Sequence, residues 1–314
     1  MAVKLVTGGA GFIGSHLVEA LLARGSCVRV LDDFSTGLRE NLPRHDALEV
    51  VAGSINSAGT LDDAMREVDC VFHLAAIASV ARSVADPEGT ARVNLGGTVA
   101  VLEAAGRAGI RRLVFASSGS IYGDAGAGPI AEDCPADPLS PYARQKWESE
   151  RACAAFVRTN GLEAAVLRFF NVYGARQRPD SDYTGVVSIF IDHALAGRAP
   201  KIYGDGEQTR DFVHVSDVVA AVMAAAERPG ALLGPINIGT GRSVTVNSIW
   251  AEMRRIAGLT LEARHVPPRA GDTRHSLADA RRAAERLGWQ AAVPFAVGLE
   301  RLLRERGLVR GAAQ

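Results

Sequence analysis

A tyrosine and a lysine four residues apart, Tyr142 and Lys146, are the side chains best suited to acid–base chemistry in this sequence. They follow Ser140-Pro141, a typical N-cap and first helical residue, so both fall on one face of the predicted helix. A phenol has a pKa of roughly 10, so it acts as a base near neutral pH only beside positive charge, which Lys146 could supply. The same spacing is common on exposed helix surfaces, so its meaning depends on the rest of the chain.

Ser118 lies in a Ser- and Gly-rich segment directly after the apolar stretch Leu113 to Ala116. If that stretch is a strand of an open parallel sheet, the segment lies at the carboxyl edge, where such sheets bind their ligands. Serines after strands are often only turn formers. Together with Tyr142 and Lys146, however, Ser118 is positioned to hydrogen-bond a reacting hydroxyl group.

Three glycines, Gly8, Gly11 and Gly14, follow the strand-like stretch Val3 to Val6 and open a predicted helix near Phe12. Glycines at this spacing allow a tight turn and a close approach of the backbone to a pyrophosphate, which binds at the positive end of the helix. Because the glycines have the required strand before them and helix after them, the sequence predicts a dinucleotide site.

An acidic residue supports this prediction. Asp32 ends the second predicted strand, where the residue that binds the ribose hydroxyls of a dinucleotide is expected. Asp33 follows it in place of a basic residue, and this negative charge would repel the extra phosphate of NADP. The sequence therefore predicts NAD as the cofactor.

The elements that position these residues alternate between short apolar stretches and longer stretches of helical periodicity. This pattern predicts an α/β fold, a Rossmann-type doubly wound parallel sheet with a smaller C-terminal α/β region for the substrate. We expect an NAD-binding domain over 1–170, to which the chain returns around 212–240, and a mainly substrate-binding region over 171–314. The expected strands are Val3 to Val6, Val28 to Leu31, Leu48 to Val51, Cys70 to Leu74, Leu113 to Ala116 and Ala165 to Phe169.

Composition excludes several classes of protein. The 314 residues are 47% hydrophobic, with 35 basic and 35 acidic side chains and no block of like charge, so nucleic acid is not an expected partner. Apolar runs are far shorter than the ~20 residues of a membrane span. No signal peptide is recognisable, and the four cysteines lack the spacing of a metal or disulfide framework. We expect a cytoplasmic protein without a bound metal.

The three motifs together resemble the extended short-chain dehydrogenase/reductase (NAD-dependent epimerase/dehydratase) family, and within it the UDP-glucose 4-epimerases. The resemblance covers nearly the whole chain. It rests on Gly8-Gly-Ala-Gly11-Phe-Ile-Gly14, His73-Leu-Ala-Ala76, Asn94-Leu-Gly-Gly-Thr98, Ser117-Ser118-Gly-Ser-Ile-Tyr122-Gly123, Tyr142-Ala-Arg-Gln-Lys146, Arg168-Phe-Phe-Asn171-Val-Tyr-Gly174, Gly204-Asp-Gly-Glu-Gln-Thr-Arg210-Asp-Phe212 and Arg269-Ala-Gly-Asp272.

The resemblance implies a role for each matching position, beginning with Ser118, Tyr142 and Lys146 as catalytic residues. Residues that would bind NAD are Gly8, Gly11, Phe12, Ile13, Gly14, Asp32, Asp33, Ser35, Thr36, Gly37, Ser54, Ile55, Leu74, Ala75, Ala76, Asn94, Tyr142, Lys146 and Phe170. Residues that would hold the UDP-sugar are Ser118, Ser120, Asn171, Val187, Tyr203, Arg210, Arg269, Asp272 and Ser276.

The implied activity is inversion at C4 of a UDP-hexose such as UDP-glucose or UDP-galactose. Tyr142 would remove the C4 hydroxyl proton while the C4 hydride passes to NAD, and the 4-keto sugar would take the hydride back on its other face. The family usually dimerises through two helices per subunit, here expected near Asn94 to Ala108 and Pro141 to Thr159.

Three departures from the family pattern bear on the substrate. Ser54 replaces an aspartate that recognises adenine in many relatives. Ser276 replaces a bulky aromatic residue, which leaves room for an N-acetyl group at C2. Arg178 stands in a loop where it could meet a C6 carboxylate, so UDP-glucuronate is an alternative substrate.

Two other functions remain alternatives. A nucleotide-sugar dehydratase or decarboxylase of the same family would carry a glutamate close after the catalytic serine, whereas this chain has Gly119-Ser120. A non-catalytic NAD-binding regulator would typically have lost the tyrosine or the lysine, and both Tyr142 and Lys146 are present.

Overall fold

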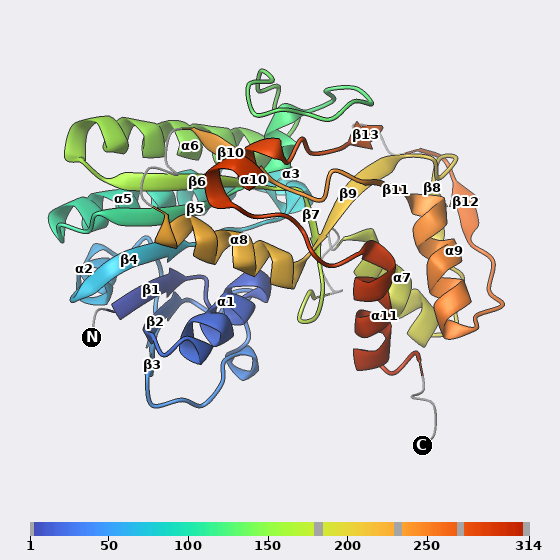
Figure 1. The fold of residues 1–314 in the computed structure, drawn as a ribbon, viewed down its shortest axis with the longest axis horizontal. Helices are drawn as coiled ribbons and strands as arrows, with labels where there is room; N and C mark the ends of the chain where they lie inside the picture. The colour runs from blue at the N-terminus through green and yellow to red at the C-terminus, as the bar shows by residue number, and fades with distance from the viewer. Residues whose placement is uncertain (1–2, 179–184, 229–233, 269–272, 310–314) are drawn as a thin grey trace.

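Seven parallel strands form the main sheet of the computed structural model, which describes residues 3–178, 185–228, 234–268 and 273–309 (Figure 1). Their order across the sheet is β10-β6-β5-β4-β1-β2-β3, the doubly wound arrangement that the alternating pattern predicted. The strands are β1 (Val3–Thr7), β2 (Cys27–Asp32), β3 (Leu48–Ala52), β4 (Val68–His73), β5 (Arg112–Ser118), β6 (Glu163–Phe169) and β10 (Pro235–Ile238).

Helices cover both faces of this sheet and enclose two apolar cores. One face packs against α1 (Phe12–Ala23), α8 (Val215–Glu227) and α10 (Arg281–Leu287). The other packs against α2 (Ala58–Ala64), α5 (Gly97–Arg107) and α6 (Pro141–Asn160). Because both faces are covered, the strands are mostly apolar, as is typical of parallel sheets, and charged residues are few within them. Shorter elements are η1 (Arg39–Asn41), α3 (Val80–Ala85), α4 (Pro87–Ala91), the π-helical turn η2 (Arg92–Gly96) and η3 (Gly119–Tyr122).

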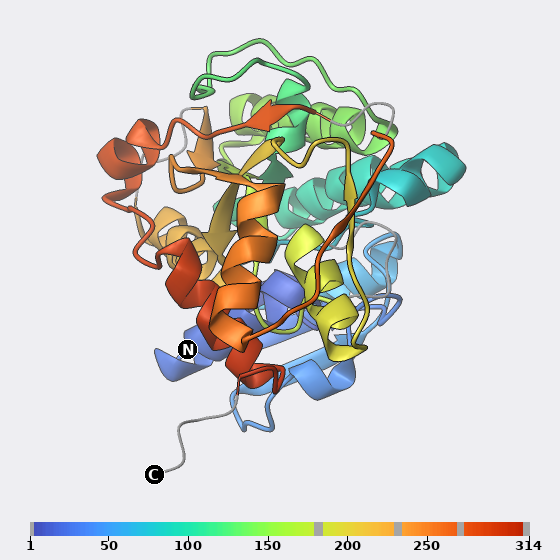
Figure 2. The same cartoon turned by 90° about the vertical axis from the view of Figure 1, so that its right-hand side faces the viewer.

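A second, smaller α/β region lies beside the carboxyl edge of the main sheet (Figures 1 and 2). Its core gathers aromatic and branched side chains, among them Phe190, Trp250 and Leu299. The elements are β7 (Asn171–Tyr173), α7 (Val186–Leu195), β8 (Lys201–Tyr203), β9 (Thr209–His214), β11 (Ser243–Thr245), α9 (Val246–Ala257), β12 (Arg264–Val266), β13 (His275–Ser276) and α11 (Phe295–Glu305).

The chain crosses between the two regions more than once. The stretch around 212–240, where we expected the chain to return to the NAD-binding domain, begins with the end of β9 and with α8, which serve different regions. β9 pairs with β7, β11 and β13 in the small sheet, whereas α8 packs on the main sheet. β9 ends at His214, which caps the start of α8, because its ring nitrogen accepts a hydrogen bond from the Ser216 N–H. The predicted boundary near residue 170 stays a prediction.

The crevice that concerns function begins where the strand order reverses, between β1 and β4. Thr7 and His73 pair there, at the carboxyl ends of these two strands. Open α/β sheets bind ligands at this switch point. Within the part of the chain that the structure describes, no helix is both long enough and apolar enough to cross a membrane.

Candidate active site

The backbone of the turn after β1 is packed so tightly that a side chain at Gly8 or Gly14 would not fit. Gly8 has a φ of 71°, and a Cβ added there would lie 2.7 Å from the Ala75 nitrogen. A Cβ on Gly14 would lie 2.1 Å from the Gly8 carbonyl oxygen. The helix α1 then begins at Phe12 without a side-chain cap. This geometry leaves backbone N–H groups at a positive helix end, which fits a pyrophosphate.

Asp32 is fixed beside this turn. Its carboxylate is only 7% exposed and accepts hydrogen bonds from the N–H groups of Ala10 and Phe34, both at 2.9 Å. Burial raises the pKa of Asp32, and these two hydrogen bonds partly offset the effect. Phe34 has a φ of 56°, unusual for a residue with a large side chain, so the turn bends sharply around the carboxylate. The predicted cofactor residues Asp33, Ser35, Thr36 and Gly37 all lie in this turn.

Loops after two other strands flank this turn. The loop after β4 lies across β1 from Asp32: the Leu74 N–H donates to the Thr7 carbonyl oxygen, the Ala75 N–H donates to the Thr7 hydroxyl, and Ala76 follows. Ser54 and Ile55 follow β3, which pairs with β2 on the side of Asp32, and the Gly53 N–H donates to the Asp32 carbonyl oxygen. The Ser54 hydroxyl accepts a hydrogen bond from the Asn56 N–H. The predicted residues after β4 therefore lie across β1 from Asp32, whereas those after β3 lie beside it.

Asn94 sits in the π-helical turn η2 and is 1% exposed. Its side-chain amide donates to the carbonyl oxygen of Ile77 and to the side-chain oxygen of Gln145, and it accepts from the Ile77 N–H. These partners use most of its hydrogen-bonding capacity. Asn94 thus holds the loop of Ile77 against α6 at Gln145, between Tyr142 and Lys146. A contact between Asn94 and NAD stays a prediction.

Tyr142 and Ser118 meet across the gap between α6 and β5. Burial raises the pKa of Tyr142 to about 12, and the Ser118 side chain, close to the phenol, acts in the opposite direction. The Ser118 hydroxyl also donates to the Ser120 hydroxyl at 2.9 Å and accepts from the Ser120 N–H at 3.1 Å. The phenol is therefore protonated at neutral pH unless further positive charge comes close.

Lys146 is 4% exposed and lies behind this pair. Its Nζ donates to the Ala116 carbonyl oxygen at 2.9 Å and stands 4.9 Å from the centre of the Phe115 ring. Burial lowers the pKa of Lys146 to about 8, although the Cys153 thiol and the Glu150 carboxylate act in the opposite direction. A lysine whose pKa is lowered toward neutral pH thus lies on the same helix face as Tyr142.

The predicted UDP-sugar residues lie mostly in the second region, across the crevice. Asn171 starts β7 and pairs with Phe212, while Ser276 on β13 pairs with Arg210 on β9. Tyr203 ends β8 and is half-buried. Val187 is fully buried in the core of the region, so its side chain serves packing. Arg269 and Asp272 lie outside the described residues.

Comparison with known proteins agrees with this geometry. Residues 4–239 match the model of the NAD dependent epimerase/dehydratase family. The chain belongs to this family. It is 44% identical over 302 residues to UDP-glucose 4-epimerase of Mycolicibacterium smegmatis, covering 94% of this chain and 95% of the relative.

Two solved structures of epimerases share the fold. UDP-glucose 4-epimerase of Thermotoga maritima, solved with UDP-glucose, superposes with a TM-score of 0.92 at 40% identity, covering 96% of this chain and 97% of that one. UDP-N-acetylglucosamine 4-epimerase of Methanobrevibacter ruminantium, solved with UDP-N-acetylmuramic acid, has a TM-score of 0.92 at 35% identity and the same coverage of 96% and 97%.

In this member of the NAD dependent epimerase/dehydratase family, Tyr142, Ser118 and Lys146 are arranged so that a proton can be transferred to or from a substrate hydroxyl. NAD, when bound, supplies the acceptor and donor of a hydride. Tyr142 and Ser118 bring two hydroxyls together at the end of β5, and Lys146 supplies charge behind them. Phe170 packs against Gly119, the residue after Ser118, because a Cβ on Gly119 would lie 3.2 Å from its ring.

Arg178 lies beside the predicted cofactor turn. Its guanidinium donates to the Thr36 carbonyl oxygen at 3.3 Å, in the turn that follows Asp32. The suggested contact between Arg178 and a C6 carboxylate stays a prediction.

Several residues around the site escaped the sequence analysis. Gln145 anchors Asn94, and Thr7 bridges the Ala75 N–H to the ring of His73. Buried polar residues on α6 were the available signal, since Gln145 and Glu150 fall on its apolar face. Their partners in other elements lie 18 to 58 residues away in the chain, so the sequence alone does not identify them.

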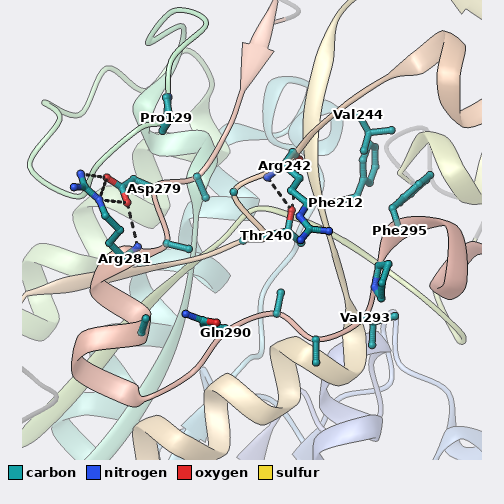
Figure 3. A pocket seen from close by; sticks show the side chains of 18 residues that line it. Pro129, Phe212, Thr240, Arg242, Val244, Asp279, Arg281, Gln290, Val293 and Phe295 are labelled. Carbon is teal, nitrogen blue, oxygen red and sulfur yellow. Dashed lines mark hydrogen bonds and ion pairs between the residues drawn. The ribbon is translucent and has the colours of Figure 1, made fainter.

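A cavity of about 720 Å³ lies away from this site, between the turn after β10, α10 and the segment that leads into α11 (Figure 3). Arg242, Phe212 and Phe295 line it, and Asp279 there is paired with Arg281. None of the predicted site residues lines this cavity. Within the described residues there is no group of three or more His, Cys, Asp or Glu side chains that could hold a metal ion.

Proposed function

We propose that this protein is an NAD-dependent 4-epimerase of UDP-hexoses that interconverts UDP-glucose and UDP-galactose and also accepts the N-acetylhexosamine forms. The observation that carries the proposal is that Ser118 lies close to the phenol of Tyr142, with Lys146 behind them, at the sheet edge beside a dinucleotide turn. The similarity to UDP-glucose and UDP-N-acetylglucosamine 4-epimerases supports the nature of the substrate.

In this proposal the chain's own residues handle the proton at C4. Tyr142, as phenolate, accepts the C4 hydroxyl proton, and Ser118 orients that hydroxyl through its own hydrogen bond. Lys146 stabilises the phenolate by its positive charge. The same tyrosine returns the proton after the 4-keto sugar has presented its other face. Arg210, with Tyr203 and Asn171, would hold the UDP portion so that only the sugar turns.

The second region sets the substrate range. Ser276 is a small, half-buried residue in register with Arg210, so the wall of the sugar site carries no bulky ring at this position. This supports acceptance of an N-acetyl group at C2. Gly119 and Ser120 place no acid beside Ser118, so nothing here favours dehydration or decarboxylation.

Assembly and location belong to the proposal too. We propose a homodimer that pairs α5 and α6 with the same helices of a second subunit, by analogy with the family. A cytoplasmic location agrees with the four cysteines, which are all free thiols in the structure.

Proton NMR of three substrates tests the activity. The purified protein is incubated, without added cofactor, with UDP-glucose, UDP-N-acetylglucosamine or UDP-glucuronate. Inversion at C4 of the first two supports the proposal, and inversion of UDP-glucuronate alone would change the substrate. Loss of water or carbon dioxide, or no change even with added NAD, would refute the epimerase function.

A further inference from the structure

Glu150 is a buried carboxylate one helical turn beyond Lys146 on α6. It is 8% exposed and accepts hydrogen bonds from Arg168 Nη2 at 2.7 Å and Arg168 Nε at 3.0 Å. The Ser117 hydroxyl also donates to it. Ser117 precedes Ser118 on β5, and Glu150 lies on the same helix as Tyr142 and Lys146. This carboxylate therefore links the strand that carries Ser118 to the helix that carries the other two catalytic candidates.

Arg168 is equally confined. It lies on β6, is 6% exposed, and also donates to the Tyr122 hydroxyl at 2.7 Å and the Glu132 carbonyl oxygen at 3.1 Å. Its guanidinium stands 4.8 Å from the centre of the Tyr122 ring. These contacts come from three separate parts of the chain. The guanidinium therefore cannot follow Glu150 if the carboxylate moves.

Lys146 and Glu150 have the i, i+4 spacing at which a helix normally allows an ion pair. The Lys146 ammonium instead donates to the Ala116 carbonyl oxygen. Two other titratable groups act on it, the Cys153 thiol on α6 and the His73 imidazole on β4. Burial raises the pKa of Cys153 to about 12 and lowers the pKa of His73 to about 3, so both are neutral at pH 7. Glu150 is thus the one anion, within the described chain, that acts on Lys146.

We propose that Arg168 is a positioning residue that holds the Glu150 carboxylate away from Lys146, so that the ammonium stays directed at the catalytic side of α6. Without Arg168, Glu150 is a buried charge without that partner, and Lys146, on which it already acts, lies one helical turn away on α6. The two would pair, and Tyr142 would lose the positive charge that stabilises its phenolate. The inference rests on the proposed roles of Tyr142 and Lys146.

The chain offers a direct readout, because it contains only three lysines, Lys4, Lys146 and Lys201. Protein labelled with [ε-13C]lysine gives three NMR signals, and the Lys4→Arg and Lys201→Arg variants assign them. In the cofactor-free protein we expect Arg168→Gln to raise the pKa of Lys146 by about one pH unit or more. The double variant Arg168→Gln/Glu150→Gln, which keeps a neutral hydrogen-bonding pair, should bring that pKa back to or below the wild-type value.

Activity supplies the second readout. Arg168→Gln should lower kcat about tenfold or more, with little change in KM, and move the acidic limb of the pH profile to higher pH. The double variant should recover most of kcat. A purely structural role predicts the opposite order, with the double variant at least as impaired as the single one. An unchanged pKa of Lys146 in Arg168→Gln would overturn the inference.

Two further measurements test the inference if Arg168→Gln does not fold or the protein is inactive. If Arg168→Gln does not fold, Glu150→Gln and the double variant decide the matter. Both must keep kcat within about threefold of wild type, and a larger loss in either refutes the inference. If the wild-type protein converts no UDP-sugar, the proposed function fails. The titration of Lys146 still tests whether Arg168 holds Glu150 away from it.

Discussion

The ammonium of Lys146 donates a hydrogen bond to the carbonyl oxygen of Ala116 at 2.9 Å. Two residues further along the same strand, Ser118 lies close to the Tyr142 phenol and lowers its pKa, against the larger effect of burial. The end of β5 therefore lies beside both functional groups of the Tyr-x-x-x-Lys motif.

Replacing Tyr142 by Phe should abolish turnover and leave NAD bound. The phenol is the proposed proton acceptor, and loss of such a group costs about 10²- to 10⁴-fold in rate. Measurement of kcat with UDP-glucose, together with release of NAD from the denatured protein, checks both statements. Full activity of this variant would refute the proposed mechanism, and loss of NAD would place Tyr142 in cofactor binding instead.

The ionisation of Tyr142 should depend on the cofactor. Burial raises the pKa of Tyr142 to about 12, so the phenol stays protonated through pH 10 in the cofactor-free protein. The positive charge of bound oxidised NAD should lower this pKa, and the rate should then rise with pH. The difference in tyrosinate absorbance between the wild type and Tyr142→Phe, titrated with and without NAD, measures the effect. A tyrosinate assigned to Tyr142 below pH 9 without cofactor would contradict it.

Substitution of Ser276 by Tyr should narrow the substrate range. A large ring on β13 would occupy the space proposed for the N-acetyl group at C2. We expect epimerisation of UDP-N-acetylglucosamine to fall about tenfold or more, while the rate with UDP-glucose stays within about threefold. Ser276→Ala is the matched control and should change neither rate. Equal losses with both substrates would show that Ser276 does not select between them.

The glycine turn should tolerate no methyl group at Gly14. A Cβ there would lie 2.1 Å from the Gly8 carbonyl oxygen, so Gly14→Ala must distort the turn. We expect loss of bound NAD and a lower melting temperature. Gly106→Ala, in a helix position with open space around it, is the control and should keep both. NAD content of the purified proteins and thermal unfolding report the outcome, and normal NAD content in Gly14→Ala would refute the pyrophosphate site.

Because of His73, the free energy of unfolding should decrease at acidic pH. It is buried and neutral between Thr7 and Thr98, and burial lowers the pKa of His73 from 6.5 to about 3. Because the unfolded chain binds this proton more readily, the free energy of unfolding should fall by about 1.4 kcal/mol for each pH unit below 6.5, down to the folded pKa.

Urea unfolding at pH 7, 5.5 and 4.5 measures this slope. The His73→Asn variant lacks the titrating group, so its stability should change less steeply with pH. Identical slopes in the two proteins would show that His73 does not contribute.

The sequence by itself determined the features that depend on short-range geometry. A strand, three glycines and a helix within the first 23 residues can form only a tight turn, because local sterics dictate the path of the backbone. The spacing of Tyr142 and Lys146 places both on one helix face through the periodicity of the helix. The alternation of apolar strands and helices likewise predicted the doubly wound sheet, which the strand order confirms.

Only the tertiary structure decided which distant groups meet. The amide of Asn94 is engaged by Ile77 and Gln145, Val187 is buried in a core, and Arg178 lies beside the turn that follows Asp32. The pairing of Glu150 with Arg168 joins a helix to a neighbouring strand. Such contacts depend on how the elements pack and on which buried charges find partners, and no local pattern in the sequence encodes that.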